Sequence, residues 1–177
     1  MEFTNQIIPE VVNNFNVYEG SGDMLVGITD EMTLADLAYN VATVTGAGIP
    51  GSYEVPIIGH FGSIVQEVPF RVLYKPVMKI CNPMKVVTLN MRGAIQVLDK
   101  STGVSDFVGI RYVVKGRAKQ LSPGSLKPGS VMGTKVQIEC TQLLFEADGV
   151  KLIEVDKLAN IFRIEGVDYM EKLRKLC

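Results

Sequence analysis

Hydrophobic and polar residues alternate along most of the chain, and the clearest alternation covers residues 86–98. Apolar side chains occupy one parity, and polar side chains such as Thr88, Asn90, Arg92 and Gln96 occupy the other. A period of two residues predicts a strand with one buried face. Comparable runs cover residues 104–120, 134–147 and 150–165. The middle of the chain is therefore predicted to be mainly antiparallel β.

Turn-forming residues separate these runs. The first run ends in DKSTG (residues 99–103), and a loop rich in glycine and proline, SPGSLKPGSVMG, covers residues 122–133. Asp148-Gly149 joins the last two runs, and Asp-Gly between two strands favours a tight hairpin turn. We expect residues 134–147 and 150–165 to form one hairpin.

Three other segments have less regular patterns. Residues 33–45 fit helical spacing by their apolar positions, whereas the β-branched residues at the end of the segment favour a strand, so both remain open. Pro69, Pro76 and Pro83 predict an irregular segment with room for one short element. Residues 168–177 predict a short helix that starts with a capping box, Asp168 to Glu171.

Composition excludes several classes of protein. The chain has 177 residues and a net charge of -1, which suits one domain without a general attraction to nucleic acid or membrane. Its three cysteines have no short spacing, which predicts reduced thiols made in a cytosol and no zinc site. The most apolar stretch, residues 55–74, contains His60 and Arg71, so no membrane anchor is predicted. No cofactor is predicted either.

A glycine motif stands out in TGAGIPGSYEVP (residues 45–56), where Gly46, Gly48 and Gly51 have the spacing G-x-G-x-x-G. Dinucleotide binding needs a helix after these glycines to hold the phosphates. Here Ser-Tyr-Glu-Val alternates like a strand, and Pro56 would block the interior of a helix. The favoured interpretation is a turn between two strands, and a nucleotide-binding enzyme is the disfavoured alternative.

Four cations share one parity in the run at residues 104–120: Arg111, Lys115, Arg117 and Lys119. On a strand they would form a basic stripe able to contact phosphates. A solvated face, or ion pairs with a neighbouring subunit, is the favoured interpretation because no aromatic residues interleave with the cations.

Several segments, taken in order, resemble one family. They are GAGIPG (residues 46–51), VPIIGHFGS (55–63), LNMRGAIQVLDKSTG (89–103), VKGRAKQ (114–120) and DGVKLIEVDKLANIFRIEGVDYMEKLRK (148–175). The chain is similar, from about Phe15 to its C-terminus, to the major tail tube protein of contractile-tailed phages and phage-tail-like bacteriocins. Each motif is weak alone, and their order and spacing carry the resemblance.

The resemblance implies a mainly β fold, a small antiparallel β-barrel or sandwich with a flanking helix, like the tube proteins of type VI secretion systems. It implies rings of six subunits, stacked into a tube inside a contractile sheath, with no catalysis. DNA or ions would pass through the lumen without specific binding. Implied partners are other copies, the sheath, and baseplate and tape-measure proteins, in a particle assembled in the cytoplasm of a host bacterium. A type VI-like tube is the alternative.

The resemblance also assigns expectations to residues. It favours a strand for residues 33–45, and it implies a helix near residues 61–84, where the three prolines leave its position open. A lumen that passes DNA should not be basic, so Asp36, Asn40 and Glu54 are expected to face it. The basic stripe is then expected on the outside or at a subunit joint. Loops expected to contact the next ring contain Gly46, Gly48, Gly51, Ser125, Lys127 and Gly129, together with an N-terminal arm (residues 1–14).

Overall fold

The computed structural model of the chain describes residues 6–20 and 22–177. Its fold is mainly antiparallel β, as predicted. One nine-stranded sheet has the order β11-β10-β9-β8-β7-β6-β1-β2, with β5 pairing β8 beside this path, and β3 and β4 form a separate two-stranded sheet. The strands are β1 (Ile7–Glu19), β2 (Asp23–Met24), β3 (Tyr39–Val44), β4 (Tyr53–Phe61), β5 (Val65–Phe70), β6 (Val87–Asp99), β7 (Ser105–Ser122), β8 (Thr134–Ala147), β9 (Val150–Asp156), β10 (Ile161–Ile164) and β11 (Val167–Asp168).

The long strands β6, β7 and β8 form the centre of the sheet, and their bounds lie close to the predicted runs. Leu98 pairs with Ser105 across the β6–β7 turn, and the strand β8 has the predicted bounds. Two register shifts interrupt the β7–β8 pairing, between Lys115 and Gly116 and between Ala118 and Gln120. Such bulges bend a strand and increase its twist. Residues 142–147 of β8 pair with β9, whereas residues 134–139, beyond the first bulge, pair with β5.

The hydrophobic core lies on one face of the sheet, where α1 (Lys75–Ile80) and residues 31–38 cover it. Val68 and Phe70 from β5, Val77 and Ile80 from α1, and Leu89 from β6 are fully buried. The helix tolerates Pro76 because it occupies the first turn, where its missing N–H would have no partner in the helix. Pro76 therefore lies in the first turn of the short helix whose position the sequence left open.

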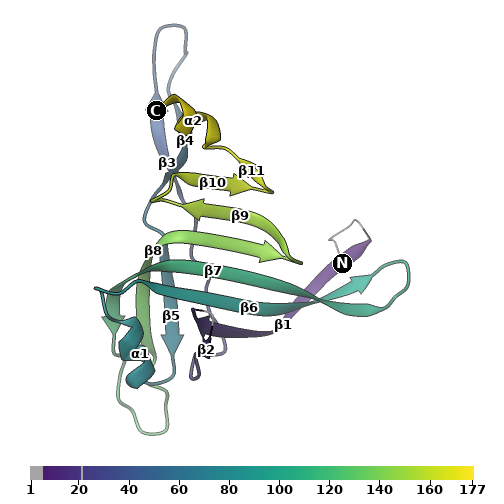
Figure 1. Cartoon of the computed structure of the whole chain (residues 1–177), viewed down its shortest axis with the longest axis vertical. Helices are drawn as coiled ribbons and strands as arrows, with labels where there is room; N and C mark the ends of the chain where they lie inside the picture. Colours follow the sequence, from purple (N-terminus) through teal and green to yellow (C-terminus); the bar gives the residue numbers. More distant parts are fainter. Residues whose placement is uncertain (1–5, 21) are drawn as a thin grey trace.

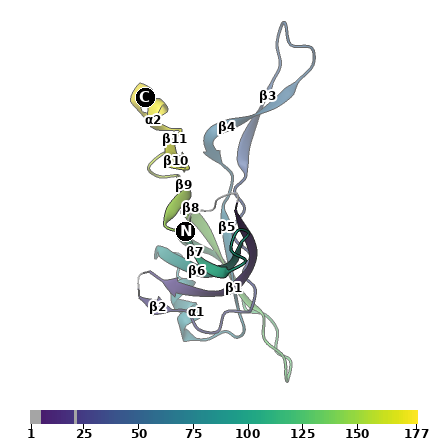
Figure 2. The same ribbon diagram turned by 90° about the vertical axis from the view of Figure 1, so that its right-hand side faces the viewer.

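Two segments project from opposite ends of the molecule. The hairpin of β3 and β4 extends beyond the sheet at one end of the long axis, and the loop of residues 123–133 extends at the other (Figures 1 and 2). The C-terminal helix α2 (Glu171–Leu176) lies near the base of the hairpin. The long axis of the protein thus ends in a loop on each side.

Three expectations about elements need correction. From Ile7 onward, the expected N-terminal arm is strand β1, which pairs with β6, while residues 1–5 lie outside the described part. The expected strand at residues 150–165 is two strands, because Asp156 accepts backbone hydrogen bonds from Leu158 and Ala159 and reverses the chain. The expected capping box is absent: helix α2 starts at Glu171 with Met170 as its N-cap, and Asp168 belongs to β11.

The expected strand at residues 33–45 is also shorter, because β3 starts at Tyr39. Residues 31–38 form no element and run as a strap over the sheet. Neither helix of the described part is long or apolar enough to cross a membrane.

Candidate assembly surfaces

The β3–β4 hairpin leaves apolar side chains in solvent. Val41 and Tyr53 are each 54% exposed and Ile58 is 60% exposed. Glu54 is the only acidic residue, and no lysine or arginine occurs, between residues 39 and 61. Isolated two-stranded hairpins are marginally stable in water, and contiguous exposed apolar surface commonly marks an interaction site. We call the paired parts, residues 39–44 and 53–61, the hairpin stem.

An aromatic cluster fixes the base of the stem to the C-terminal strands. The ring centroids of Tyr39 and Phe61 lie 5.3 Å apart, those of Phe61 and Phe162 5.1 Å, and those of Phe162 and Tyr169 5.8 Å. Met170 packs against Gly59, where an added Cβ would lie 2.1 Å from the methionine sulfur. These contacts attach the base of the hairpin to the C-terminal strands, and the rest of the hairpin extends away from them.

Gln66 on β5 holds the strap that leads into the hairpin. Its side chain is fully buried, its Nε2 donates to the carbonyls of Thr33 and Glu67 at 2.8 Å, and its Oε1 accepts from the Ala35 N–H at 3.0 Å. A buried amide with all these partners orders the segment it binds. Sequence patterns gave no signal for this role, because a glutamine in an alternating strand resembles a solvent-facing residue.

A charged cluster joins residues 62–63, which directly follow β4, to the sheet. Lys157 Nζ donates to the Gly62 carbonyl at 2.6 Å, and Lys119 Nζ lies 3.4 Å from a Glu139 carboxylate oxygen that also accepts from the Ser63 hydroxyl. Desolvation raises the pKa of Glu139, but these donors outweigh it and hold the pKa below its ordinary value. The hairpin is thus attached to the body by polar as well as aromatic contacts.

The glycine motif forms the tip of this hairpin. Gly48 and Gly51 have φ of 87° and 104°, a region that favours glycine, and the Ile49 N–H donates to the Gly46 carbonyl at 3.1 Å. The chain then enters strand β4, so no helix follows to hold a phosphate. The expected turn between two strands is confirmed, and the dinucleotide-binding interpretation loses the helix on which it depends.

The loop at the opposite end contains Ser125, Lys127 and Gly129. Its ends are tied together, because the Ser125 N–H donates to the Met132 carbonyl at 2.9 Å and the Thr134 hydroxyl donates to the Pro123 carbonyl at 2.8 Å. Leu126 at its tip is 87% exposed. This loop therefore presents an apolar side chain to solvent at the end of the molecule farthest from the hairpin tip.

The three residues expected to face a lumen do not share one face. Asp36 lies in the strap rather than on β3, and it and Asn40 occupy exposed positions of one parity. Glu54 pairs with Thr43, and Val55 pairs with Ala42. By strand alternation Asn40 shares the Ala42 face, so Glu54 lies on the opposite face of the hairpin. Parity within each strand could not show this, because the register between the two strands decides it.

The four cations of the basic stripe lie on one exposed face of β7, alternating with buried residues such as Tyr112 and Val114. Arg111 pairs with Glu146 at 3.3 Å, and Lys119 pairs with Glu139. Lys115 and Arg117 have no ion pair within the described residues. Half of the stripe is therefore paired with carboxylates of β8.

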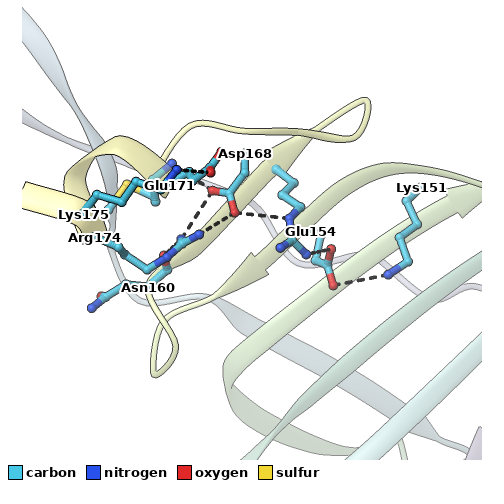
Figure 3. A network of polar contacts seen from close by, with 9 residues as sticks. Lys151, Glu154, Asn160, Asp168, Glu171, Arg174 and Lys175 are labelled. Carbon is cyan, nitrogen blue, oxygen red and sulfur yellow. Dashed lines mark hydrogen bonds and ion pairs between the residues drawn. The ribbon is translucent and has the colours of Figure 1, made fainter.

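A chain of ion pairs organises the C-terminal strands and α2 (Figure 3). Arg163 bridges Glu154 at 2.9 Å and Asp168 at 3.3 Å, and Arg174 reaches the same Asp168 at 2.7 Å. The Arg174 guanidinium, with help from the Met170 N–H, holds the pKa of Asp168 below its ordinary value against desolvation. These contacts keep the aromatic cluster in place under the hairpin base.

Open strand edges, an exposed apolar hairpin and loops at both ends are features of a structural subunit that assembles through its surface. Comparison with known proteins agrees. The chain belongs to the phage tail tube protein FII family, whose model matches residues 9–176. It is 26% identical over 173 residues to the tail tube protein of Escherichia phage P2, covering 95% of this chain and 96% of that protein.

A solved structure has a related fold. It is the sheath/tube terminator of an extracellular contractile injection system in its extended state, with a TM-score of 0.55 and 11% sequence identity. The match covers 78% of this chain and 97% of that chain. At this identity the likeness concerns the fold alone.

Proposed function

We propose that this chain is the subunit of the inner tube of a contractile tail, and that six copies close into a ring that stacks on other rings. The observation that carries the proposal is the arrangement of surfaces. Among the described residues, the outer edge of β1 is open over most of its length, since β2 pairs with it only at Tyr18 and Glu19. Closing a ring covers such edges, and head-to-tail contacts between two different surfaces generate rings.

Stacking would use the two projecting ends. The tip that contains Gly46, Gly48 and Gly51 would meet the neighbouring ring at one end, and the loop that contains Ser125, Lys127 and Gly129 would meet it at the other. Their positions at opposite ends of the long axis support this role. Deleting residues 125–129 is expected to leave rings that do not form tubes, as seen by electron microscopy. Normal tubes from that variant would contradict the role of the loop.

The lumen would carry Asp36 and Asn40, and the basic stripe would face outward. DNA in transit would bind a basic wall, because each cation in contact with a phosphate adds affinity. Lys115 and Arg117, which have no ion pair among the described residues, would then be available to the sheath. In particles carrying Asp36→Lys, DNA delivery should slow while tubes still assemble, and Asp106→Lys on the β6–β7 hairpin is the matched control. Normal delivery by Asp36→Lys particles would contradict the lumen assignment.

The proposed setting is a phage or bacteriocin particle assembled in a bacterial cytoplasm, with a baseplate and a tape-measure protein at the start of the tube and DNA or ions as cargo. A tube of a type VI-like secretion system would use the same contacts. Negative-stain electron microscopy of the purified protein over a concentration series tests the assembly. Six-fold rings or stacked tubes are expected, and a uniform monomer at every concentration would count against the proposal.

A further inference from the structure

The β6–β7 hairpin and the start of β1 form an arm that extends beyond the rest of the sheet (Figure 1). The arm consists of residues 7–11 and 95–108. Val11 pairs with Gln96, and Gln96 pairs with Phe107, so these three side chains share one face of the arm. Val11 is 56% exposed and Phe107 is 60% exposed. This face is therefore apolar and open to solvent.

One carboxylate lies on the same face of the arm. Gln96 Nε2 donates to Glu10 Oε2 at 2.8 Å, which holds the Glu10 carboxylate close to Gln96, between the two apolar side chains. Glu10 is exposed, and it has no ion pair with any residue that the structure describes. The open edge of β1, which the proposed ring closure covers, runs along this arm. The arm thus presents apolar surface around one uncompensated negative charge.

A surface of the opposite charge lies on α1 and the residues after it. Residues 75–86 contain three lysines and no carboxylate. Lys75 and Lys79 are exposed one helical turn apart, on either side of Met78, which is 52% exposed. Met84, beyond the helix, is 85% exposed. The three lysines have no ion pair within the described part of the chain, so this surface is apolar and basic.

The two outer lysines of α1 differ in their surroundings. Lys79 borders a shallow hollow together with two carboxylates of the β1–β2 turn, Glu19 and Asp23. Those carboxylates compensate part of its charge even without a direct ion pair. Lys75 does not border this hollow. Lys75 is therefore the cation of α1 with the most charge left for a partner.

The arm and α1 lie on opposite sides of the molecule. In Figure 1 the arm extends to the right and α1 lies at the lower left, and in Figure 2, which views the molecule from the side of the arm, α1 is farther from the viewer. The arm cannot reach α1 of its own chain in this arrangement. A contact that joins two different surfaces is heterologous, and repeating it by rotation closes a ring.

We propose that the arm of one copy packs on α1 of the neighbouring copy in the ring, with Val11 and Phe107 against Met78 and with Glu10 pairing with Lys75. Complementary charges fix the register of such a contact, and the apolar side chains around them bury surface. This inference rests on the proposed function, because it names the lateral contact that closes the ring. It is separate from the contacts along the long axis that would stack one ring on another.

Cross-linking tests the contact directly. Cys81 and Cys177 are first replaced by serine, so that only one buried thiol of the natural chain remains. Rings and tubes of the Val11→Cys/Met78→Cys variant in this background are then treated with a short bismaleimide. A ladder of covalent products is expected, and it should end at six subunits even in tubes, because the contact lies within one ring.

The matched control for cross-linking is Val11→Cys/Leu158→Cys. Leu158 is 79% exposed at the turn after β9, so a thiol there is at least as accessible as one at residue 78, and no ladder is expected. Intact tubes without a ladder, or an equal ladder in the control, would overturn the contact and leave the proposed function standing. A ladder that continues beyond six subunits would place the contact between rings and would also overturn it.

Charge reversal gives a second readout that does not depend on cysteine geometry. Glu10→Lys should raise the concentration needed for assembly about tenfold or more, because like charges then face each other across the interface. Adding Lys75→Glu should restore assembly. The matched control is Glu165→Lys, a reversal at the exposed turn between β10 and β11, which should assemble like the wild-type protein.

The outcomes separate this contact from the proposed function. No rescue by the Glu10→Lys/Lys75→Glu variant, with single and double variants folded by circular dichroism, would overturn the pairing. An equal effect of Glu165→Lys would do the same, since the loss would then follow net charge rather than a contact. Failure of the wild-type protein to form any ring or tube would instead count against the proposed function itself.

Discussion

The sheet body and the β3–β4 hairpin are built from similar strands but place their apolar side chains differently. In the body, Val68, Phe70 and Leu89 are fully buried against α1 and the strap. In the hairpin, Val41, Tyr53 and Ile58 are more than half exposed. The difference shows that the body buries these side chains within one chain, whereas those of the hairpin stay exposed, which is typical of a surface that a partner covers.

The largest expected effect comes from emptying the core of the body. Phe70→Ala should lower the free energy of unfolding by about 3–5 kcal/mol, because it removes a fully buried ring and leaves a cavity. Phe107→Ala is the matched control, since Phe107 is 60% exposed, and its change should stay within about 0.5 kcal/mol. Urea denaturation of the unassembled protein measures both. Similar losses of unfolding free energy in the two variants would contradict the distinction between buried and exposed apolar positions.

A steric change at the β7–β8 bulge should have the next largest effect. A Cβ at Gly116 would lie 2.0 Å from the Glu139 carbonyl oxygen, so Gly116→Ala should cost about 2 kcal/mol or more. Gly109 lies on the same strand with nothing within 4 Å of its added Cβ, and Gly109→Ala should be nearly neutral. The midpoint temperatures of thermal unfolding of the two variants measure this difference. Equal midpoints would mean that the bulge can relax and does not fix the pairing of β8.

Removing the hydrogen bonds between Gln66 and the strap should have a smaller effect. Gln66→Leu leaves the Ala35 N–H and the Thr33 carbonyl without their buried partner, which should cost about 1–3 kcal/mol. Gln120→Leu, at an exposed position, is the control. Denaturation gives the cost, and faster hydrogen exchange at Ala35 would identify its source. An unchanged exchange rate of the Ala35 amide would contradict this role of Gln66.

The smallest expected effect depends on pH. Asp168 has a pKa held below its ordinary value by Arg174, so its ion pairs stabilise the fold above the unfolded-state pKa of about 3.9 and are lost as the pH falls through the folded-state pKa. Asp168→Asn should therefore destabilise the protein at neutral pH, and the difference from wild type should shrink below about pH 4. Glu171→Gln, at an exposed pair with Lys175, should change little at any pH. A pH-independent loss in Asp168→Asn would point to packing instead.

Alternation in the sequence was enough to predict the central strands and the hairpin turns. Residues 134–147 form β8 as predicted, and Asp148 and Gly149 have the positive φ of a tight turn. Alternation could not tell that the N-terminal residues pair with β6, because Pro9 and the register shifts after it break the pattern.

Local sequence patterns could not predict the contacts between distant segments. The lumen assignment joined Asn40 and Glu54 by parity, yet the cross-strand register separates them. The contacts of Gln66 with the strap and the aromatic cluster depend on which segments meet in space, and no local pattern carries that information. Part of the stem lies in the apolar stretch of residues 55–74, but the sequence does not say whether such a face is covered by the same chain or by a partner.

Hydrogen–deuterium exchange, compared between the unassembled protein and purified tubes, tests the central claim most directly. We expect amides of the hairpin stem to exchange rapidly in the unassembled protein and to become strongly protected in tubes, while amides of β6, β7 and β8 are protected in both. Stem amides that are equally protected in both states, or equally fast in both, would contradict the claim that this hairpin is an assembly surface.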